Sequence, residues 1–333
     1  MVIDVYLPLV EYNTLTQRWA EFDKWKYNFM SVCVLGSINL DIVASVEHLP
    51  CPGETISARS LEHFPGGKGA NQAVASARIC ADTLMIGAAG ADDPGEKMRA
   101  YLAESGIDIS VVITKPDQPT GQAFINVSAS GENAIVVVPG ANAALGVDDI
   151  SCVDLAPYQV FLAQLESPVK SIEALFKSKS AKRGTTILNA APALAEGADL
   201  FSLVDILIVN ETELATYGGL IESTDDQDAV INAAQKLLTG DGQTVVVTLG
   251  AKGVVVVDKN SSEHVESLSV EVLDTTGAGD CFCGVLSAAL SEGQGLIDAI
   301  KLAVTAAGIS VGRAGAATSM PQRNEIEAIL ADG

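Results

Sequence analysis

The sequence predicts an α/β protein built on a mainly parallel sheet, and two observations support this. Short apolar runs typical of buried strands recur along the chain, and segments with helical apolar spacing separate many of them. The runs cover residues 32–36, 83–88, 159–163, 185–189, 205–209, 244–248 and 253–257. Such alternation favours parallel strands covered by helices on both faces. With 333 residues, 48% of them hydrophobic, the chain can bury a large core.

Two stretches, residues 39–64 and 118–139, interrupt this alternation. Both contain segments in which apolar and polar residues alternate, as strands with one solvated face do. The sequence Ser-Gly-Glu-Asn at 130–133 has the composition of a hairpin turn between two such strands. We therefore expect a second, small β-sheet beside the main one.

Residues 1–30 fit the α/β pattern least, and we expect an N-terminal extension there, followed by one domain over 31–333. The segment lacks the basic start of a secretion signal, and no stretch of the chain is clean enough to span a membrane. Residues 15–29 could form a short amphipathic helix. Three interpretations of this segment remain open: an arm packed on the body, an extension ahead of a true start at Met30, and a targeting segment.

Charge and cysteine usage narrow the class of protein. The net charge of −22 argues against nucleic acid as a partner, because phosphates would be repelled. Six cysteines are scattered without a C-x-x-C pair, which favours neither a zinc site nor a disulfide framework and suggests a reducing compartment. We expect a cytoplasmic enzyme with no membrane segment.

The turn at residues 274–280, Asp-Thr-Thr-Gly-Ala-Gly-Asp, carries the strongest chemical signal. Residues 268–273 alternate like a strand, and a helical pattern follows the turn, so its backbone amides would lie at the positive end of a helix. Such a turn favours a bound anion. Asp280 is placed to take a proton from a hydroxyl that attacks phosphorus, although an Asp there could also only cap the helix.

A second glycine cluster, residues 65–72, opens another helical run. Its glycines let a ligand approach the backbone, Lys68 supplies a cation, and Asn71 can donate and accept hydrogen bonds. Upstream, Asn39 and Asp41 are two residues apart and would share one face of an extended segment, where they could hold adjacent sugar hydroxyls. A plain loop and ordinary turn residues are the alternative interpretations.

Taken together, these segments resemble the PfkB carbohydrate kinase family, and within it the kinases of ribose. Residues 66–72 and 274–280 match the two family signatures, and 164–168 and 210–213 match further blocks. The resemblance extends from Ser31 to the C-terminus. It implies a three-layer α/β/α body, a β-sheet lid formed from about 39–64 and 118–139, and a homodimer in which two lids clasp each other. It also implies ATP-dependent phosphorylation of D-ribose at its 5-hydroxyl.

The resemblance also implies a role for each matching residue. Asp280 would be the general base, and the amides of Gly277, Ala278 and Gly279 would form an anion hole. The sugar would be held by Asn39, Asp41, Gly67, Lys68, Asn71, Glu166 and Asp280. ATP would contact Asn210, Glu213, Thr248, Gly250, Gly253, Gly279 and Val304, with Mg²⁺ held near Glu213 through water. An activating K⁺ would bind the side chains of Asp274 and Ser319 and the carbonyls of Thr276, Ser310, Arg313 and Gly315.

One residue departs from the family pattern. Family members often carry His or Asn at the position of Val304, against the adenine ring, and a valine cannot hydrogen-bond there. This leaves phosphate-donor preference open. The alternative function is that of a kinase for another small sugar, such as deoxyribose or fructose, or for a nucleoside. A non-catalytic sugar- or nucleotide-binding protein is a third possibility.

Overall fold

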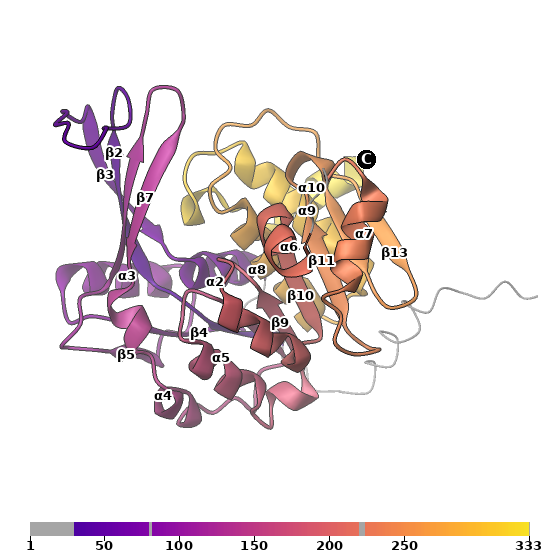
Figure 1. Cartoon of the computed structure of the whole chain (residues 1–333). Helices are drawn as coiled ribbons and strands as arrows, with labels where there is room; N and C mark the ends of the chain where they lie inside the picture. The colour runs from indigo at the N-terminus through magenta and orange to yellow at the C-terminus, as the bar shows by residue number, and fades with distance from the viewer. Residues whose placement is uncertain (1–29, 80–81, 220–223, 333) are drawn as a thin grey trace, which may run out of the picture.

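The computed structural model describes residues 30–79, 82–219 and 224–332. Its main sheet has nine strands in the order β13-β12-β11-β10-β9-β8-β1-β4-β5 (Figure 1). In chain order the strands are β1 (Ser31–Leu35), β4 (Asp82–Ala89), β5 (Val112–Thr114), β8 (Val160–Gln164), β9 (Thr185–Asn189), β10 (Ile206–Asn210), β11 (Thr244–Thr248), β12 (Val254–Val257) and β13 (Ser262–Val265).

The strands from β5 to β11 pair in parallel, whereas β12 is antiparallel to both of its neighbours, β11 and β13, so β12 alone runs in the opposite direction. The predicted fold class is therefore confirmed, and all seven predicted strands are present to within a residue or so. Two strands of the main sheet, β5 and β13, were not predicted. β5 spans three residues and β13 reads Ser-Glu-His-Val, so neither has an apolar run long enough to be recognised.

Helices cover both faces of this sheet and make two cores. Along β1, Val32 and Val34 face one core, whereas Cys33 and Leu35 face the other, as the two-residue period of a strand requires. Helices α2 (Lys68–Ile79), α3 (Asp93–Glu104), α8 (Ala278–Ser291), α9 (Leu296–Val311) and α10 (Arg323–Asp332) contribute to the first. Helices α4 (Val147–Ser151), α5 (Val169–Phe176), α6 (Glu211–Gly218) and α7 (Gln227–Gln235) contribute to the second.

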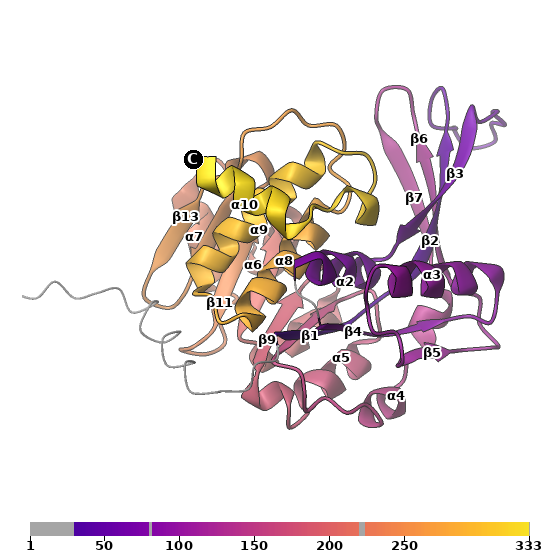
Figure 2. The same cartoon turned by 180° about the vertical axis from the view of Figure 1, so that it is seen from behind.

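A second sheet of four strands projects from one end of the body, as Figures 1 and 2 show. Its order is β3-β2-β6-β7, formed by β2 (Asn39–Ser45), β3 (Ser60–Gly66), β6 (Gly121–Val127) and β7 (Asn133–Val138). We call it the lid sheet. The hairpin between β6 and β7 turns at Gly131, whose φ of 85° is a left-handed conformation that glycine adopts readily. The edge strand β7 is exposed along its whole length.

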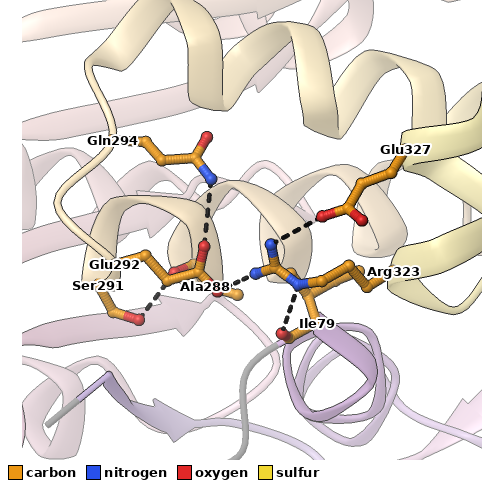
Figure 3. Close-up of polar contacts among 7 residues, drawn as sticks. All are labelled: Ile79, Ala288, Ser291, Glu292, Gln294, Arg323 and Glu327. Atoms are coloured by element: carbon orange, nitrogen blue, oxygen red, sulfur yellow. Dashed lines mark hydrogen bonds and ion pairs between the residues drawn. The ribbon is translucent and has the colours of Figure 1, made fainter. Parts of the chain in front are cut away.

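Helices α2 and α8 lie side by side and run in the same direction. Midway along them, a Cβ on Gly284 would lie 2.3 Å from the carbonyl oxygen of Gln72, so this close approach requires glycine. At their C-terminal ends, Arg323 of α10 donates to the Ile79 carbonyl (3.2 Å) and pairs with Glu292 and Glu327 (Figure 3). The N-terminal ends of both helices consequently meet at one place.

One strand prediction was wrong, and another expectation lies outside the described residues. Residues 268–273 pair with no strand in the described part of the chain; instead the segment is mostly exposed, and the amides of Leu273 and Asp274 at its end donate to the Val311 carbonyl. Alternation alone does not make a strand when no partner edge is available. The predicted N-terminal extension falls almost entirely on residues that the structure does not describe. Among the described helices, none is both long and apolar enough to cross a bilayer.

Candidate active site

The predicted site residues lie where the parallel strands end, the usual position of ligand sites in open α/β sheets. Asp280 stands in the first turn of α8 and is buried, with 6% of its surface exposed. Its Oδ2 accepts from the Asn71 side-chain amide at 3.0 Å, and its Oδ1 accepts from the Gln72 amide at 2.9 Å. Two helices that are far apart in the sequence thus build the surroundings of this carboxylate.

Gly277 precedes α8 in a left-handed conformation, with φ of 76°. A Cβ there would lie 2.9 Å from Ala316, so glycine suits this position for two reasons. Of the three amides expected in the anion hole, that of Ala278 donates weakly to the Thr275 carbonyl at 3.3 Å. The amides of Gly277 and Gly279 have no acceptor within the described part of the chain, so both can face an anion.

Lys68 begins α2 among carboxylates. Its backbone amide donates to Glu166 Oε2 at 3.1 Å, and the Ser37 hydroxyl donates to the same oxygen at 2.5 Å. The charges of Asp280, and less strongly of Glu166 and Glu213, raise the pKa of Lys68, although burial lowers it. Lys68 is therefore a charged ammonium that the charges of the base candidate and Glu166 stabilise.

Asn39 and Asp41 share one face of β2, as their spacing predicts. The Asn142 amide donates to Asn39 Oδ1 at 2.8 Å and fixes that side chain. Asp41 packs against Gly66, where a Cβ would approach the carboxylate to 2.2 Å. Burial, and then the charges of Glu166 and Asp280, raise the pKa of Asp41 to about 7.

Two buried acceptors in this cluster lack a hydrogen-bond partner among the described residues: Asp41 Oδ1 and Asn71 Oδ1. Buried polar atoms are nearly always paired, so each points to a donor supplied by a ligand. Ligand hydroxyl groups would satisfy both. The arrangement therefore suits a small polyol lying between the lid sheet and the start of α2.

A cleft of about 1110 Å³ opens next to Asp280 and continues along the ends of β10 to β12. Six of the seven residues predicted to contact ATP line it: Asn210, Thr248, Gly250, Gly253, Gly279 and Val304. Gly279 is the residue before Asp280, so the cleft ends beside the base candidate. Its lining includes apolar side chains suited to a flat ring, such as Val304, Val270 and Phe282.

Glu213, the seventh of these residues, does not line the cleft. It forms a reciprocal capping box with Asn210 at the start of α6: Glu213 Oε2 accepts from the Asn210 amide at 2.8 Å, and Asn210 Oδ1 accepts from the Glu213 amide at 3.0 Å. Burial raises the pKa of Glu213, against the lowering effects of that bond and of Lys68. Glu213 therefore has a structural task as a cap whatever else it binds.

The residues predicted to bind a monovalent cation lie on two loops that touch. Asp274 Oδ1 accepts from the Thr276 amide (2.9 Å) and hydroxyl (2.6 Å), and Asp274 Oδ2 accepts from the Gly315 amide at 2.9 Å. Partial burial raises the pKa of Asp274, but these bonds outweigh it and lower the value overall. Ser319 and Ser310 are buried and donate to the Ala316 and Ala307 carbonyls, while Arg313 pairs with Glu325. A carboxylate, hydroxyls and carbonyls are oxygen donors that suit a hard cation.

Three polar residues outside the predicted set support this site. Ser37 binds Glu166, Asn142 holds Asn39, and Gln72 contacts Asp280. Gln72 follows Asn71 directly in the signature, which is the one local signal that could have found it. Ser37 and Asn142 reach their partners only through the tertiary fold, and no short motif marks them.

Fold and site together define a class of enzyme. A carboxylate lies at a helix end suited to an anion, with residues suited to a polyol on one side and a large cleft on the other. This is the arrangement of a phosphotransferase. The model of the pfkB family of carbohydrate kinases matches residues 30–323. The ribokinase of Haemophilus influenzae is 40% identical over 297 residues, which cover 89% of this chain and 96% of that protein. This chain belongs to the pfkB family of carbohydrate kinases.

Solved structures agree with this assignment. The ribokinase of Thermotoga maritima is similar with a TM-score of 0.82 at 37% identity, covering 91% of this chain and 100% of that one. The Arabidopsis thaliana ribokinase, in complex with ribose and ATP, has a TM-score of 0.77 at 31% identity, covering 90% and 98%. The family resemblance and the fold expected from it are both confirmed.

Proposed function

We propose that this chain is a ribokinase, which transfers the γ-phosphoryl group of ATP to the 5-hydroxyl of D-ribose. One observation carries the proposal. Asp280, at the start of α8, accepts a hydrogen bond from Asn71, which belongs to the group of residues expected to hold the sugar. Asp280 also follows directly after Gly279, which lines the large cleft. The ribokinases described above, one of them seen with ribose and ATP, support the choice of both substrates.

In this proposal the sugar lies across the cluster formed by Asn39, Asp41, Gly67, Lys68, Asn71 and Glu166. Asp41 Oδ1 and Asn71 Oδ1, two buried acceptors without a partner among the described residues, accept hydrogen bonds from sugar hydroxyl groups. Glu166 is held by Ser37 and so is oriented before the sugar arrives. Prepared acceptors of this kind reduce the ordering cost of binding.

Asp280 then takes the proton of the 5-hydroxyl as that oxygen attacks the γ-phosphorus. Negative charge on the transferring group is stabilised by the ammonium of Lys68 and the amides of Gly277 and Gly279, with the Ala278 amide joining if it leaves the Thr275 carbonyl. Such preorganised donors contribute a few kcal/mol in a site that excludes water. Phosphoryl transfer needs chiefly this positioning and neutralisation of charge.

Two metal ions complete the proposal. Mg²⁺ would accompany ATP near Asn210 and Glu213, with Glu213 acting through water, and would neutralise phosphate charge when bound. K⁺ would bind between the loop of Asp274 and Thr276 and the loop carrying Ser310, Arg313, Gly315 and Ser319. The contact of these loops through Asp274 and Gly315 supports that site.

The decisive variant is Asp280→Asn. The amide cannot accept the hydroxyl proton, so we expect kcat for ribose to fall by at least about a hundredfold while ribose still binds. The measurement is a coupled ADP assay together with calorimetric titration of ribose. Asp92→Asn is the control, because Asp92 also caps a helix, α3, but lies outside the site. An Asp280→Asn enzyme with wild-type kcat would refute the role of the base.

The choice of sugar is tested with the same assay on ribose, deoxyribose, fructose and a nucleoside. The proposal expects the highest kcat/KM for ribose. A higher value for another substrate would assign the chain to a sibling kinase. ADP formation with none of them, with ribose binding retained, would instead support a non-catalytic binding protein.

The cation site is tested with Asp274→Ala. Removing this carboxylate takes away the only charged ligand proposed for K⁺, so we expect stimulation of kcat by KCl over tetramethylammonium chloride to drop to less than about twofold. Thr318→Ala is the control on the same loop, since Thr318 is exposed and its hydroxyl makes one long hydrogen bond among the described residues, to the Ala314 carbonyl at 3.4 Å. Equal potassium stimulation of wild type and Asp274→Ala would exclude the site.

We also propose a homodimer formed through the lid sheet and a cytoplasmic location. The lid sheet carries exposed apolar side chains on both faces, Leu61, Phe124, Val136 and Val138 on one and Ile135 and Val137 on the other, which a second copy would cover. The five described cysteines are all free, which suits a reducing compartment.

A further inference from the structure

We infer that Gln72 is a positioning residue for the catalytic base: its side-chain amide, held by Gln164, orients the carboxylate of Asp280 for proton transfer. This inference rests on the proposed function, because it assumes that Asp280 acts as the base. Gln72 does not line the cleft and has no exposed surface, so it acts through Asp280 and not on the substrate.

The hydrogen bonds around Gln72 allow one orientation of its amide. Gln72 Oε1 accepts from Gln164 Nε2 at 2.6 Å, and Gln72 Nε2 donates to Asp280 Oδ1 (2.9 Å) and Asn189 Oδ1 (3.1 Å). In the opposite orientation, Gln72 Oε1 would face two acceptor oxygens, one of them on a carboxylate. That arrangement is repulsive, so the amide points its two N–H groups toward Asp280 and Asn189.

The backbone keeps this amide in place. Gln72 lies on α2 opposite Gly284 of α8, and Gly284 is one turn after Asp280. Gln164 ends β8 and Asn189 ends β9, and both strands are neighbours in the parallel sheet. The sheet and two helices therefore converge on this one side chain, which has no freedom to follow a moving ligand.

The consequence is that the two oxygens of Asp280 are not equivalent. Oδ1 is engaged by Gln72 on the fully buried side, and Oδ2 is engaged by Asn71, whose own Oδ1 is an unpaired acceptor in the sugar cluster. Rotation of the carboxylate would break both bonds. Oδ2 is accordingly the oxygen turned to the sugar, and Gln72 keeps it there.

The test uses two variants of similar size in the full-length chain. Gln72→Met removes both N–H donors, and Gln72→Glu replaces them with a second acidic group facing Asp280. For both variants we expect kcat to fall by about tenfold or more. KM for ribose should change less than about threefold, because the residues proposed to bind the sugar stay in place. For Gln72→Glu we also expect the acid limb of the kcat/KM profile to move up by about one pH unit, because the added carboxyl retains a shared proton to higher pH.

Gln243→Glu is the matched control. Gln243 is also buried, but it donates to the backbone carbonyls of Phe201 and Val204 at the opposite ends of the strands. We expect a lower melting temperature and unchanged pH dependence. If the Gln72 variants do not fold, Gln164→Met removes only the bond that anchors Gln72, and a fall in kcat of about threefold at constant KM is expected.

The outcomes separate this inference from the proposed function. If wild type phosphorylates ribose and the folded Gln72 variants keep kcat within about threefold and an unmoved pH profile, the positioning role is overturned. A loss of melting temperature with kcat and KM changing together also overturns it, because that is a purely structural effect. If wild type itself does not phosphorylate ribose, the proposed function fails first.

Discussion

Three carboxylates act on the single ammonium of Lys68 in the candidate site, those of Asp280, Glu166 and Glu213. Asp41 adds a fourth acid, whose charge is opposed by Glu166 and Asp280. Before any ligand binds, negative charge therefore exceeds positive charge locally. Burial, and after it this excess of negative charge, raise the pKa of Asp41.

This residue makes stability depend on pH. The pKa of Asp41 is about 7 in the folded protein and lower in the unfolded chain. At pH values between these two pKa values, the folded protein therefore binds more protons than the unfolded chain does. Stability is therefore full at low pH and is lost as pH rises through the folded pKa. We expect Asp41→Asn, which carries no charge, to gain about 2 kcal/mol of unfolding free energy over wild type between pH 5 and pH 8. Urea unfolding of the unliganded chain at both pH values measures this.

The control is Asp108→Asn, a change of an exposed carboxylate that accepts from the Ser110 amide in a turn. It should follow the pH dependence of wild type. The same dependence in Asp41→Asn would show that Asp41 is not the titrating group. Asp41→Asn should also weaken ribose binding, since Asp41 Oδ1 is a buried acceptor without a partner among the described residues and is proposed to bind the sugar.

At the scale of elements, the site depends on the alignment of α2 and α8. Their N-terminal ends carry Lys68 and Asp280, and their C-terminal ends are joined by Arg323 (Figure 3). A cation at two helix C-termini is favourable, because carbonyl groups there are unpaired and the dipole is negative. One side chain of α10 thus ties together the far ends of both helices.

We expect Arg323→Met to lower the unfolding free energy by about 2 kcal/mol, because the Ile79 carbonyl and the mostly buried Glu292 lose a charged partner. KM values for ribose and ATP should stay within about twofold, since the ligand-binding ends of the helices are untouched. Urea denaturation and the ADP assay measure the two effects. Glu327→Gln is the control, because Glu327 is 56% exposed and its pair contributes little. Equal stability of Arg323→Met and Glu327→Gln would contradict this role.

At the scale of the whole molecule, the lid sheet stands apart from the two cores of the body and leaves apolar residues exposed (Figure 2). A strand edge of this kind invites pairing or packing with another chain. Two of the residues proposed to bind the sugar, Asn39 and Asp41, belong to its strand β2. Association through the lid sheet would therefore act on the same strand that we propose to hold the substrate.

We expect Val136→Lys to convert a dimer into a monomer in sedimentation velocity, because it places a charge in the middle of β7, where Val136 is 64% exposed. Val147→Lys is the control: Val147 is an exposed valine on α4, away from the lid sheet. A wild-type monomer, or a Val136→Lys dimer, would rule out assembly through this surface.

Much of this molecule could be predicted from the sequence because the relevant signals are local. Apolar runs identified the seven strands, and alternation identified the segments of the second sheet, since burial on one or both faces leaves a period within a few residues. Gly277 and the glycines at 66–69 marked the two helix starts for the same reason: their backbone geometry or close contacts depend on their own residue type. Where a period had no partner strand, at 268–273, the prediction was wrong.

Sequence alone thus determined the fold class, the family and the residue types available for chemistry. Only the tertiary structure decided how these residues meet: that Glu166 binds Ser37, that Asn142 fixes Asn39, and that Gln72 stands between Gln164 and Asp280. The physical reason is that such contacts join residues about 100 to 200 positions apart. They depend on side-chain distances and orientations that arise when α2, α8 and the strand ends pack together, and no local pattern encodes them.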